Sequence, residues 1–405
     1  MLVNNIVLWG LTMKNIDLLF DNNKNGNRKF VKKYVKFISF QKIWLISWKC
    51  NTLSGDDIYR LLCCLDYINT KNKSLPIYIN VDFIQFADKL VYIILECICY
   101  YIINSTNHKI YLVFGQKDTI WTEGVRYTSL SLIANDYPKD LIKRHFFKDV
   151  SLHHFRQVIV NNNIKTDFLN ELTTNIFFFF KHLKIEDSTN ELLCDSISEL
   201  VGNAIEHGHS DCLLDIDVTD SRYKKRDDNS DDNYYGINVV ILNFSDISFD
   251  KKIKNKLSKR IDLDDRYMVV KAAENIHSQH YSNNYTEDDF YTLASFQHKI
   301  SGSLKKDVAG GVGLTQLIKS LEEKSDVHLC YLLSKKRVLY FLKEFLQYDE
   351  NKYIGFNKEN NFANHIPDDS VFQHCKTFFP GTAYNLNFAI RKGDLDHGEQ
   401  SDIEI

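Results

Sequence analysis

A single amphipathic helix over residues 190–207 constrains the fold of this chain more than any other segment. Asp187 or Ser188 is suited to cap its first turn, and Gly208 is suited to end it. The apolar residues recur three and four positions apart and form one helical face; they occupy positions 192, 193, 197, 200, 201, 204 and 205. We therefore expect a helix packed against a core, with a polar edge beside it.

That polar edge carries a carboxylate and a carboxamide. Glu199 and Asn203 lie four residues apart, so their side chains stack on one face of the helix. The carbonyl oxygen of Asn203 suits a magnesium ion, which prefers oxygen ligands, and Glu199 can hold a water beside it. The alternative is that both are ordinary surface residues of an exposed helix.

A glycine-rich turn about a hundred residues later runs into a second apolar-periodic helix. It contains Gly310, Gly311 and Gly313, and the helix begins with Leu314 and Leu317 on its apolar side. Backbone N–H groups at such a turn and at a helix N-terminus can cradle phosphates. The turn has neither the Gly-Lys-Ser/Thr of a Walker A loop nor the spacing of a Rossmann fingerprint.

Together the two segments resemble the N box and the second glycine box of the GHKL (Bergerat-fold) ATPase superfamily. The likeness is greatest to anti-sigma-factor kinases and histidine-kinase-like ATPase domains, and it covers roughly residues 150–390. The resemblance implies an α+β chain whose C-terminal part is an α/β sandwich, a mixed sheet with helices on one face. It also implies ATP and Mg²⁺ as cofactors, bound between the helices and a mobile lid.

The resemblance assigns a role to each motif residue. Glu199 becomes the catalytic residue that polarises a water or a protein hydroxyl, and Asn203 the magnesium ligand. His207 stands near the phosphates, although a histidine at a helix end also complements the helix dipole. The phosphates and the lid hinge are assigned to Gly310, Gly311, Gly313 and Leu314.

The first glycine box departs from the family pattern. Asn243 stands where the family has the aspartate that accepts the adenine amine, and Ser245 replaces a glycine. An asparagine carbonyl can also accept from that amine, or Asp246 can take the role by a shift of the loop. Another nucleotide, or none, is the alternative. Thr382, after a glycine, matches the closing threonine that holds a water beside the adenine.

The first third of the chain alternates strand and helix patterns, which predicts a small α/β domain. The expected elements are strands over 43–48, 77–81 and 109–114 and helices over 55–68 and 88–103. The segment Ile77–Asp88 resembles the STAS fold of anti-sigma-factor antagonists. Lys89 stands where signalling members carry a phosphorylated serine, so the resemblance implies a structural or partner-binding copy. A generic α/β interaction domain is the alternative.

These patterns predict an organisation along the chain. The expected parts are an extension (1–40), the small α/β domain (41–118), a linker with helices (119–160), the ATP-binding domain (161–392) and a polar tail (393–405). Within the ATP-binding domain we expect a helical lid over 250–306 and a surface excursion over 347–369. Its strands are expected over 212–218, 237–242, 327–333, 338–342 and 383–390.

Composition limits the cellular location and the binding partners that we expect for this protein. The net charge of −3 makes no electrostatic case for nucleic acid or membrane binding. The basic, aromatic segment 28–36 fits a solvated helix or an edge strand better than a nucleic-acid site. The nine cysteines lack paired Cys-x-x-Cys spacing, so we expect buried free thiols and a cytoplasmic protein. The apolar run 90–103 is too short to span a bilayer.

No phosphoacceptor-histidine helix or receiver domain accompanies the motifs, which argues against a sensor histidine kinase. Three interpretations remain: an ATP-dependent regulatory switch, an anti-sigma-type kinase that phosphorylates a serine of a partner, and a nucleotide-binding interaction module without turnover. Each implies a protein partner, and the resemblance implies a homodimer.

Overall fold

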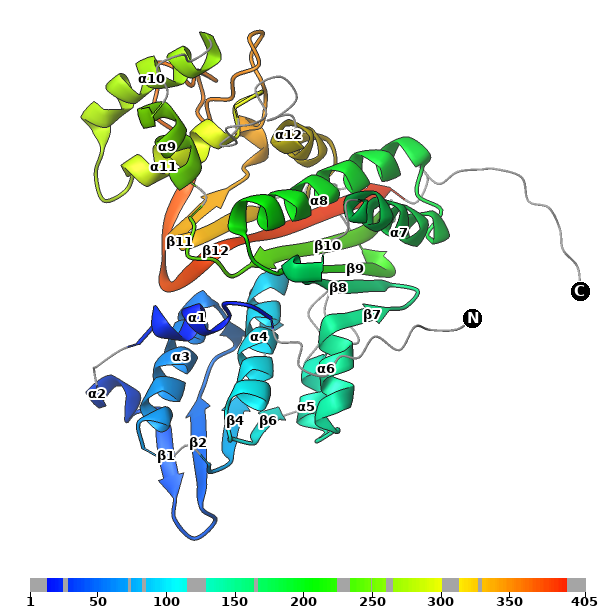
Figure 1. Cartoon of the computed structure of the whole chain (residues 1–405), viewed down its shortest axis with the longest axis vertical. Coiled ribbons are helices and arrows are strands. Elements are labelled where there is room, and N and C mark those ends of the chain that lie inside the picture. Colours follow the sequence, from blue (N-terminus) through cyan, green and yellow to red (C-terminus); the bar gives the residue numbers. More distant parts are fainter. Residues whose placement is uncertain are drawn as a thin grey trace, which may run out of the picture.

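The computed structural model of the chain describes residues 13–24, 28–71, 74–81, 85–114, 129–163, 167–223, 234–248, 250–259, 265–300, 313–326 and 330–391. In these ranges the backbone forms a four-stranded sheet, a six-stranded sheet and a two-stranded ladder (Figure 1). The α+β class expected from the sequence is confirmed.

The four-stranded sheet has the order β1-β2-β4-β6. Its strands are β1 (Val35–Ile38), β2 (Ile43–Trp48), β4 (Ile77–Val81) and β6 (Ile110–Phe114). The first pair is antiparallel and the other two are parallel. Helices α3 (Gly55–Asn69) and α4 (Lys89–Ser105) connect the parallel strands. Such crossovers are right-handed and the strand order advances in one direction, so both helices cover the same face.

Local chemistry explains where these two helices begin. Ser54 and Asp57 form a capping box at the start of α3. Asp88 caps α4 by accepting a hydrogen bond from the Val91 N–H at 2.9 Å. The predicted strand and helix positions in this region agree with the structure to within one or two residues.

Short elements complete the N-terminal part. Asn23 in the turn after α1 donates to the Phe378 carbonyl at 2.7 Å and so ties this part to the far end of the chain. The elements are α1 (Asp17–Asp21), α2 (Arg28–Val31), β3 (Thr52–Leu53), β5 (Gln85–Phe86), α5 (Ser129–Ala134) and α6 (Lys139–Phe147).

The six-stranded sheet has the order β11-β12-β10-β9-β8-β7, and all of its neighbouring strands pair antiparallel. Its strands are β7 (Lys148–Val150), β8 (His154–Ile159), β9 (Cys212–Tyr223), β10 (Tyr234–Asn243), β11 (Tyr331–Tyr340) and β12 (Phe372–Arg391). The mixed sheet expected in this half is therefore wrong for these strands, because every pair of neighbours runs antiparallel. Mixed pairing occurs in the N-terminal sheet instead.

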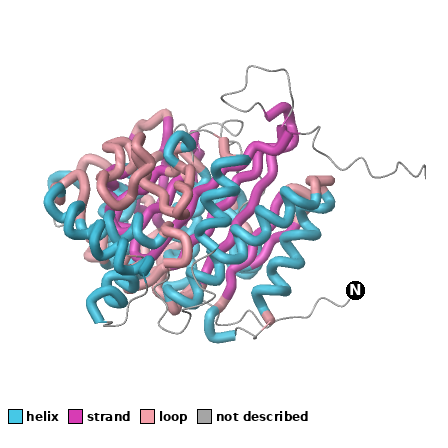
Figure 2. Tube along the Cα trace, turned by 90° about the horizontal axis from the view of Figure 1, so that it is seen from above, coloured by secondary structure: helices cyan, strands magenta, loops and turns pink. Residues whose placement is uncertain are grey.

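Helices cover both faces of the six-stranded sheet. Val239 and Ile241 of β10 face the core under α7 (Phe168–His182), α8 (Asp187–Gly208) and α12 (Gly313–Lys324). Val240 and Leu242 face the second core, which they share with α3, α4 and α6. Figure 1 shows the sheet between these two layers, and in Figure 2 the long strands run through the molecule with helices beside them.

The expected lid region is helical where it is described. It contains α9 (Lys251–Lys259), α10 (Asp265–His277) and α11 (Glu287–Ser295), which lie beyond β11 in Figure 1. The chain between β11 and β12 packs against them. Three short 3-10 helices complete the described elements: η2 (Asn161–Asn163), η3 (Ser278–His280) and η4 (Lys343–Phe345).

Three sequence expectations are corrected here. The strands expected over 327–333 and 338–342 are one strand, β11, within its described residues, because irregular pairing around Lys335 (φ 54°) bulges the chain without ending the strand. The excursion 347–369 is not only surface, since Phe356 and Phe362 are buried among the lid helices. The α8 helix begins at Asp187, and its N-cap is Glu186 rather than Asp187 or Ser188.

The expected domain boundaries also shift. Strand β1 lies in the segment expected to be an extension, and it pairs with β2. Strands β7 and β8 lie in the expected linker, yet they form the edge of the six-stranded sheet. The physical reason is strand pairing across the predicted boundaries, which hydropathy along the chain does not report.

The cysteines carry no disulfide. Seven are buried, and Cys50 and Cys375 are partly buried. Burial raises the pKa of the Cys64 thiol to about 12, so it stays protonated at neutral pH. No helix in the described ranges is long and apolar enough to cross a membrane.

Candidate functional site

Helix α8 presents the first motif beside the face that it buries. Leu193, Ile197 and Leu200 pack into the core, which leaves Glu199 exposed and Asn203 half-buried at the edge of the helix. The Asn203 Nδ2 donates to Glu199 Oε1 at 3.4 Å. The predicted stacking of these two side chains is therefore present. The side chain of His207, one turn on, lies outside the described part of the structure.

The end of α8 meets the end of β10. The helix finishes at Gly208, and His209 adopts the left-handed conformation (φ 48°) that turns the chain into β9. The Asn243 Nδ2 donates to Ser210 Oγ at 3.0 Å. A Cβ atom at Gly208 would lie 2.2 Å from that nitrogen, so a larger residue here would displace the Asn243 side chain.

Thr382 lies directly opposite Asn243, since the two residues are register partners in the β10–β12 pair. Val239 and Ile241 of β10 and Tyr384 and Leu386 of β12 face the core under α8. Because side chains alternate along a strand, Asn243 and Thr382 face the same side.

The strands approach each other closely at this point. Gly381 has φ +95°, and a Cβ there would lie 2.3 Å from the Asn243 carbonyl oxygen. Ser245, in the second slot of the degraded glycine box, donates from Oγ to the Gly208 carbonyl at 2.8 Å. Ser245 therefore holds the loop after β10 against the end of α8. Asp246, the alternative base acceptor, is exposed on that loop.

Asn243 keeps one unsatisfied atom. The residue is 2% exposed, and no described residue donates to its Oδ1. An unpaired buried acceptor costs about 1–3 kcal/mol. A donor from outside the described chain would remove that cost, which is what a ligand amine can do.

The second motif lies on the same side of the sheet. Helix α12 begins at Gly313 and packs on α8, where Ser196 Oγ donates to Ser320 Oγ at 3.3 Å. Leu314 is half-buried against the core, as expected of the first apolar residue of this helix. Gly310 and Gly311 lie outside the described residues.

His298 is a neighbour of α12 that no sequence motif selected. Its Nδ1 lies 3.2 Å from Thr315 Oγ1 in the first turn of α12. Burial, with the charges of Lys352 and Arg266, lowers the pKa of this imidazole. It is therefore neutral at physiological pH and suited to donate or accept a hydrogen bond.

A second polar cluster lies on the opposite face of the sheet, under α4. We call it the α4 network; it consists of Lys89, Glu96, Asp149, His154, Arg156 and Asp215. Asp215 is fully buried, 2.5 Å from Lys89 Nζ and 2.5 Å from Arg156 Nε. Arg156 also pairs with Glu96, which accepts from Ser129 Oγ at 2.6 Å.

Charges within the α4 network hold one another in their ionised forms. Burial alone would raise the pKa of Asp215, but Arg156, Lys89 and His154 hold it well below its usual value. Burial alone would lower the pKa of His154, but Asp215 and Asp149 raise it to about 9. These groups pair with one another inside the protein, so the cluster joins two layers of the fold. Sequence patterns missed it because its members are far apart along the chain.

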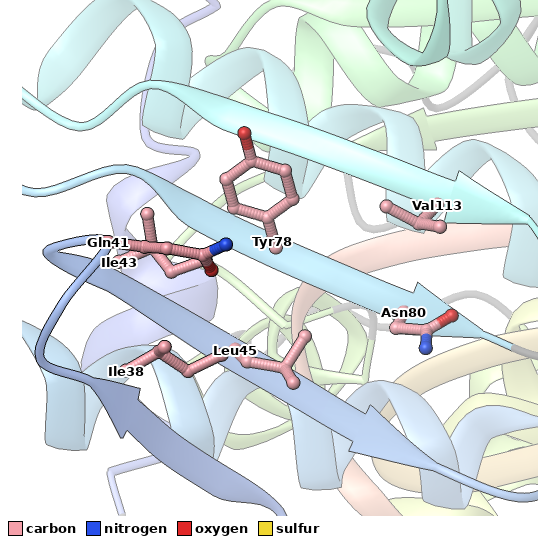
Figure 3. Close-up of a pocket in the computed structure, with 7 residues that line it drawn as sticks. All are labelled: Ile38, Gln41, Ile43, Leu45, Tyr78, Asn80 and Val113. Carbon is pink, nitrogen blue, oxygen red and sulfur yellow. The ribbon is translucent and has the colours of Figure 1, made fainter.

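A hollow of about 540 Å³ lies on the face of the four-stranded sheet opposite α3 and α4 (Figure 3). Its walls are Ile38, Gln41, Ile43, Leu45, Tyr78, Asn80 and Val113. No group of three or more His, Cys, Asp or Glu residues suited to hold a metal occurs in the part of the chain that is described. A magnesium ion at Asn203 would thus depend on ligands supplied by a nucleotide and by water.

Comparison of the chain with protein-family profiles, with curated proteins and with solved structures finds no match.

Proposed function

We propose that this protein binds Mg-ATP as a regulatory switch of the GHKL type. One observation carries the proposal: Asn243 and Thr382 face each other at adjoining strand ends, beside the end of the helix that bears Glu199 and Asn203. Four residues selected from three motifs thus lie on the same side of the sheet. The unpaired Asn243 Oδ1 supports a bound group at this place.

The chemistry of the residues fits the parts of a nucleotide. Asn243 and Thr382 offer hydrogen bonds to a base, and the N-terminus of α12 offers backbone N–H groups and a positive dipole end to phosphates. Asn203 offers an oxygen to Mg²⁺, and Glu199 can accept a proton from a water or hydroxyl. Bound Mg-ATP would supply a transferable phosphoryl group, and Glu199 decides whether that transfer is fast.

The N-terminal part supports a regulatory role. Its strand order, with the helices on one face, agrees with the proposed STAS-like fold, and α4 is docked on the sheet behind the nucleotide site. A serine kinase of the anti-sigma type is the second candidate, because the exposed Glu199 could equally receive the proton of a partner's serine. A binding module without turnover is the third.

We also propose a homodimer, and the arrangement of the helices restricts how two copies can contact each other. Helices cover both faces of the six-stranded sheet. A second copy would therefore contact the covering helices rather than a bare face of this sheet. Light scattering of the full chain, with and without nucleotide, measures this state directly.

Thermal unfolding of the full chain tests nucleotide binding. Mg-ATP at a hundred times its Kd should stabilise the native state by about 2.7 kcal/mol. That corresponds to a rise in Tm of roughly 2–5 °C for a chain of this size. AMP and ATP with a chelator are the controls, since both lack the Mg-triphosphate contacts. An unchanged Tm with ATP, ADP and a non-hydrolysable analogue would remove the proposal.

Radiolabelled ATP then separates the three candidates. Label released to water indicates an ATPase switch, and label transferred to a co-purified protein indicates a kinase. Binding without either indicates a module that only senses nucleotide.

A further inference from the structure

We infer that the base pocket does not discriminate an amine from a carbonyl at the purine C6 position, so that the protein takes ATP and the hypoxanthine nucleotide ITP alike. The inference rests on the proposed function and specifies its substrate class. It follows from the hydrogen-bonding groups that meet at the end of β10.

The decisive group is the Asn243 carboxamide. A carboxylate at this position would select a base with an amine at C6 over one with a carbonyl. An ionised carboxylate only accepts hydrogen bonds, so it rejects a base that presents a carbonyl. A carboxamide has an accepting end and a donating end, and rotation about its last bond exchanges them. Asn243 can therefore present Oδ1 to an amine or Nδ2 to a carbonyl.

The neighbour of Asn243 allows both orientations. Ser210 is fully buried, and its Oγ accepts from Asn243 Nδ2 at 3.0 Å, which leaves Oδ1 as the end without a donor among the described residues. A serine hydroxyl can also donate. If the carboxamide turns, the Ser210 hydroxyl can donate to Oδ1, and Nδ2 becomes the free end. The energy of the Ser210 contact is then similar in both states.

The other described groups at the site do not restore selectivity. Thr382, opposite Asn243, also carries a hydroxyl that donates or accepts. Ser245 is engaged with the Gly208 carbonyl. The nearest carboxylate along the chain, Asp246, is exposed on the loop after β10. Hydroxyls and an amide thus line this position, and each can reverse its hydrogen bond.

The experiment compares Mg-ATP with Mg-ITP, which differ only at C6 and in the proton on N1. Calorimetric or competition Kd values of the full wild-type chain should agree within about tenfold, or about 1.4 kcal/mol. A site with a fixed acceptor would reject the carbonyl by far more, on the order of 10⁴. A wild-type ratio above tenfold with ATP bound overturns this inference and leaves the proposed function standing. Failure to bind either nucleotide overturns both.

Asn243→Asp sharpens the test. Its carboxylate should keep ATP binding and raise the ITP-to-ATP Kd ratio at least tenfold at neutral pH. The ratio should fall again at acid pH, where a protonated carboxyl regains a donor. Asn104→Asp on α4 is the matched control, since the Asn104 side chain donates to the Tyr100 carbonyl of its own helix. An unchanged ratio in a folded Asn243→Asp protein contradicts the inference; if that variant does not fold, the wild-type ratio decides.

Discussion

At the scale of single residues, Glu199 and Asn203 touch each other yet have different proposed tasks. A general base acts in the transition state, whereas a metal ligand acts already in the bound ground state. The 3.4 Å contact between them means that either substitution also removes one hydrogen bond from the other side chain. We nevertheless expect substitution of Glu199 to affect mainly turnover and substitution of Asn203 to affect mainly binding.

Glu199→Ala should leave the Kd of Mg-ATP within a few-fold and lower turnover by about 10²–10⁴-fold. Asn203→Ala should weaken Mg-ATP binding itself by at least about tenfold. Single-turnover rates and Kd values measure both. Glu191→Ala, an exposed glutamate earlier on the same helix, is the control and should change neither. Wild-type turnover by Glu199→Ala would exclude this base.

His154 gives stability a pH dependence. Its folded pKa of about 9 lies above the ordinary value of 6.5, so its contribution is complete below about pH 6.5. The contribution is lost as the pH rises through 9, because the neutral imidazole no longer attracts Asp215 and Asp149. The shift corresponds to roughly 3 kcal/mol. Denaturant unfolding between pH 6 and 10 should show this loss, and His154→Gln should flatten it. An equal slope in both proteins would contradict the assignment.

At the scale of elements, helix α4 is held to the sheet by polar groups as well as apolar ones. Its first turn reaches three strands: Lys89 pairs with Asp215, the Leu90 N–H donates to Asn385 Oδ1 at 3.1 Å, and Asp88 accepts from Tyr331 at 2.8 Å. Buried ion pairs add little net stability when complete, but removing one member leaves an uncompensated charge.

Asp215→Ala should therefore destabilise the chain by about 3–5 kcal/mol, because Lys89 and Arg156 would remain buried without their shared partner. Lys376→Ala is the matched control. Its exposed pair with Asp56 also joins the N-terminal part to β12, and its loss should cost about 0–1 kcal/mol. Chemical denaturation of both variants measures the difference. Equal costs would mean that water reaches the α4 network.

At the scale of the whole molecule, the two sheets do not form independent domains. Strands β7 and β8 precede the expected ATP-binding domain yet complete its sheet, and α3 and α4 cover the face opposite α8. A fragment of residues 161–392 would lose two strands and expose the face that carries Asp215, Val240 and Leu242.

That fragment should fail to unfold cooperatively and should aggregate, whereas the full chain should unfold in a single cooperative transition. Circular dichroism melts and size-exclusion chromatography compare the two. A fragment starting at residue 139, which retains α6, β7 and β8 but not α4, is the control for the strands alone. A cooperative melt of residues 161–392 would show that the N-terminal layer is dispensable for folding.

Local sequence patterns determined much of the secondary structure of this protein. The elements between residues 43 and 114 follow from alternation and periodicity, and α8 follows from its apolar stripe, because side-chain spacing is a property of the sequence itself. The resemblance of local motifs to the GHKL family selected Glu199, Asn203, Asn243 and Thr382. It could not select Ser210, a lone serine in a turn with no periodic signal.

Only the tertiary structure decided which segments pair. It joined β11 across a bulge at Lys335, placed β8 in a sheet formed mainly by later residues, and brought Lys89, Arg156 and Asp215 into one buried cluster. Asn243 and Thr382 became neighbours only through the register of β10 with β12. Strand partners and buried charge pairs depend on distances between residues that are far apart in the chain. Those distances are set only when the whole chain folds, so local sequence patterns do not report them.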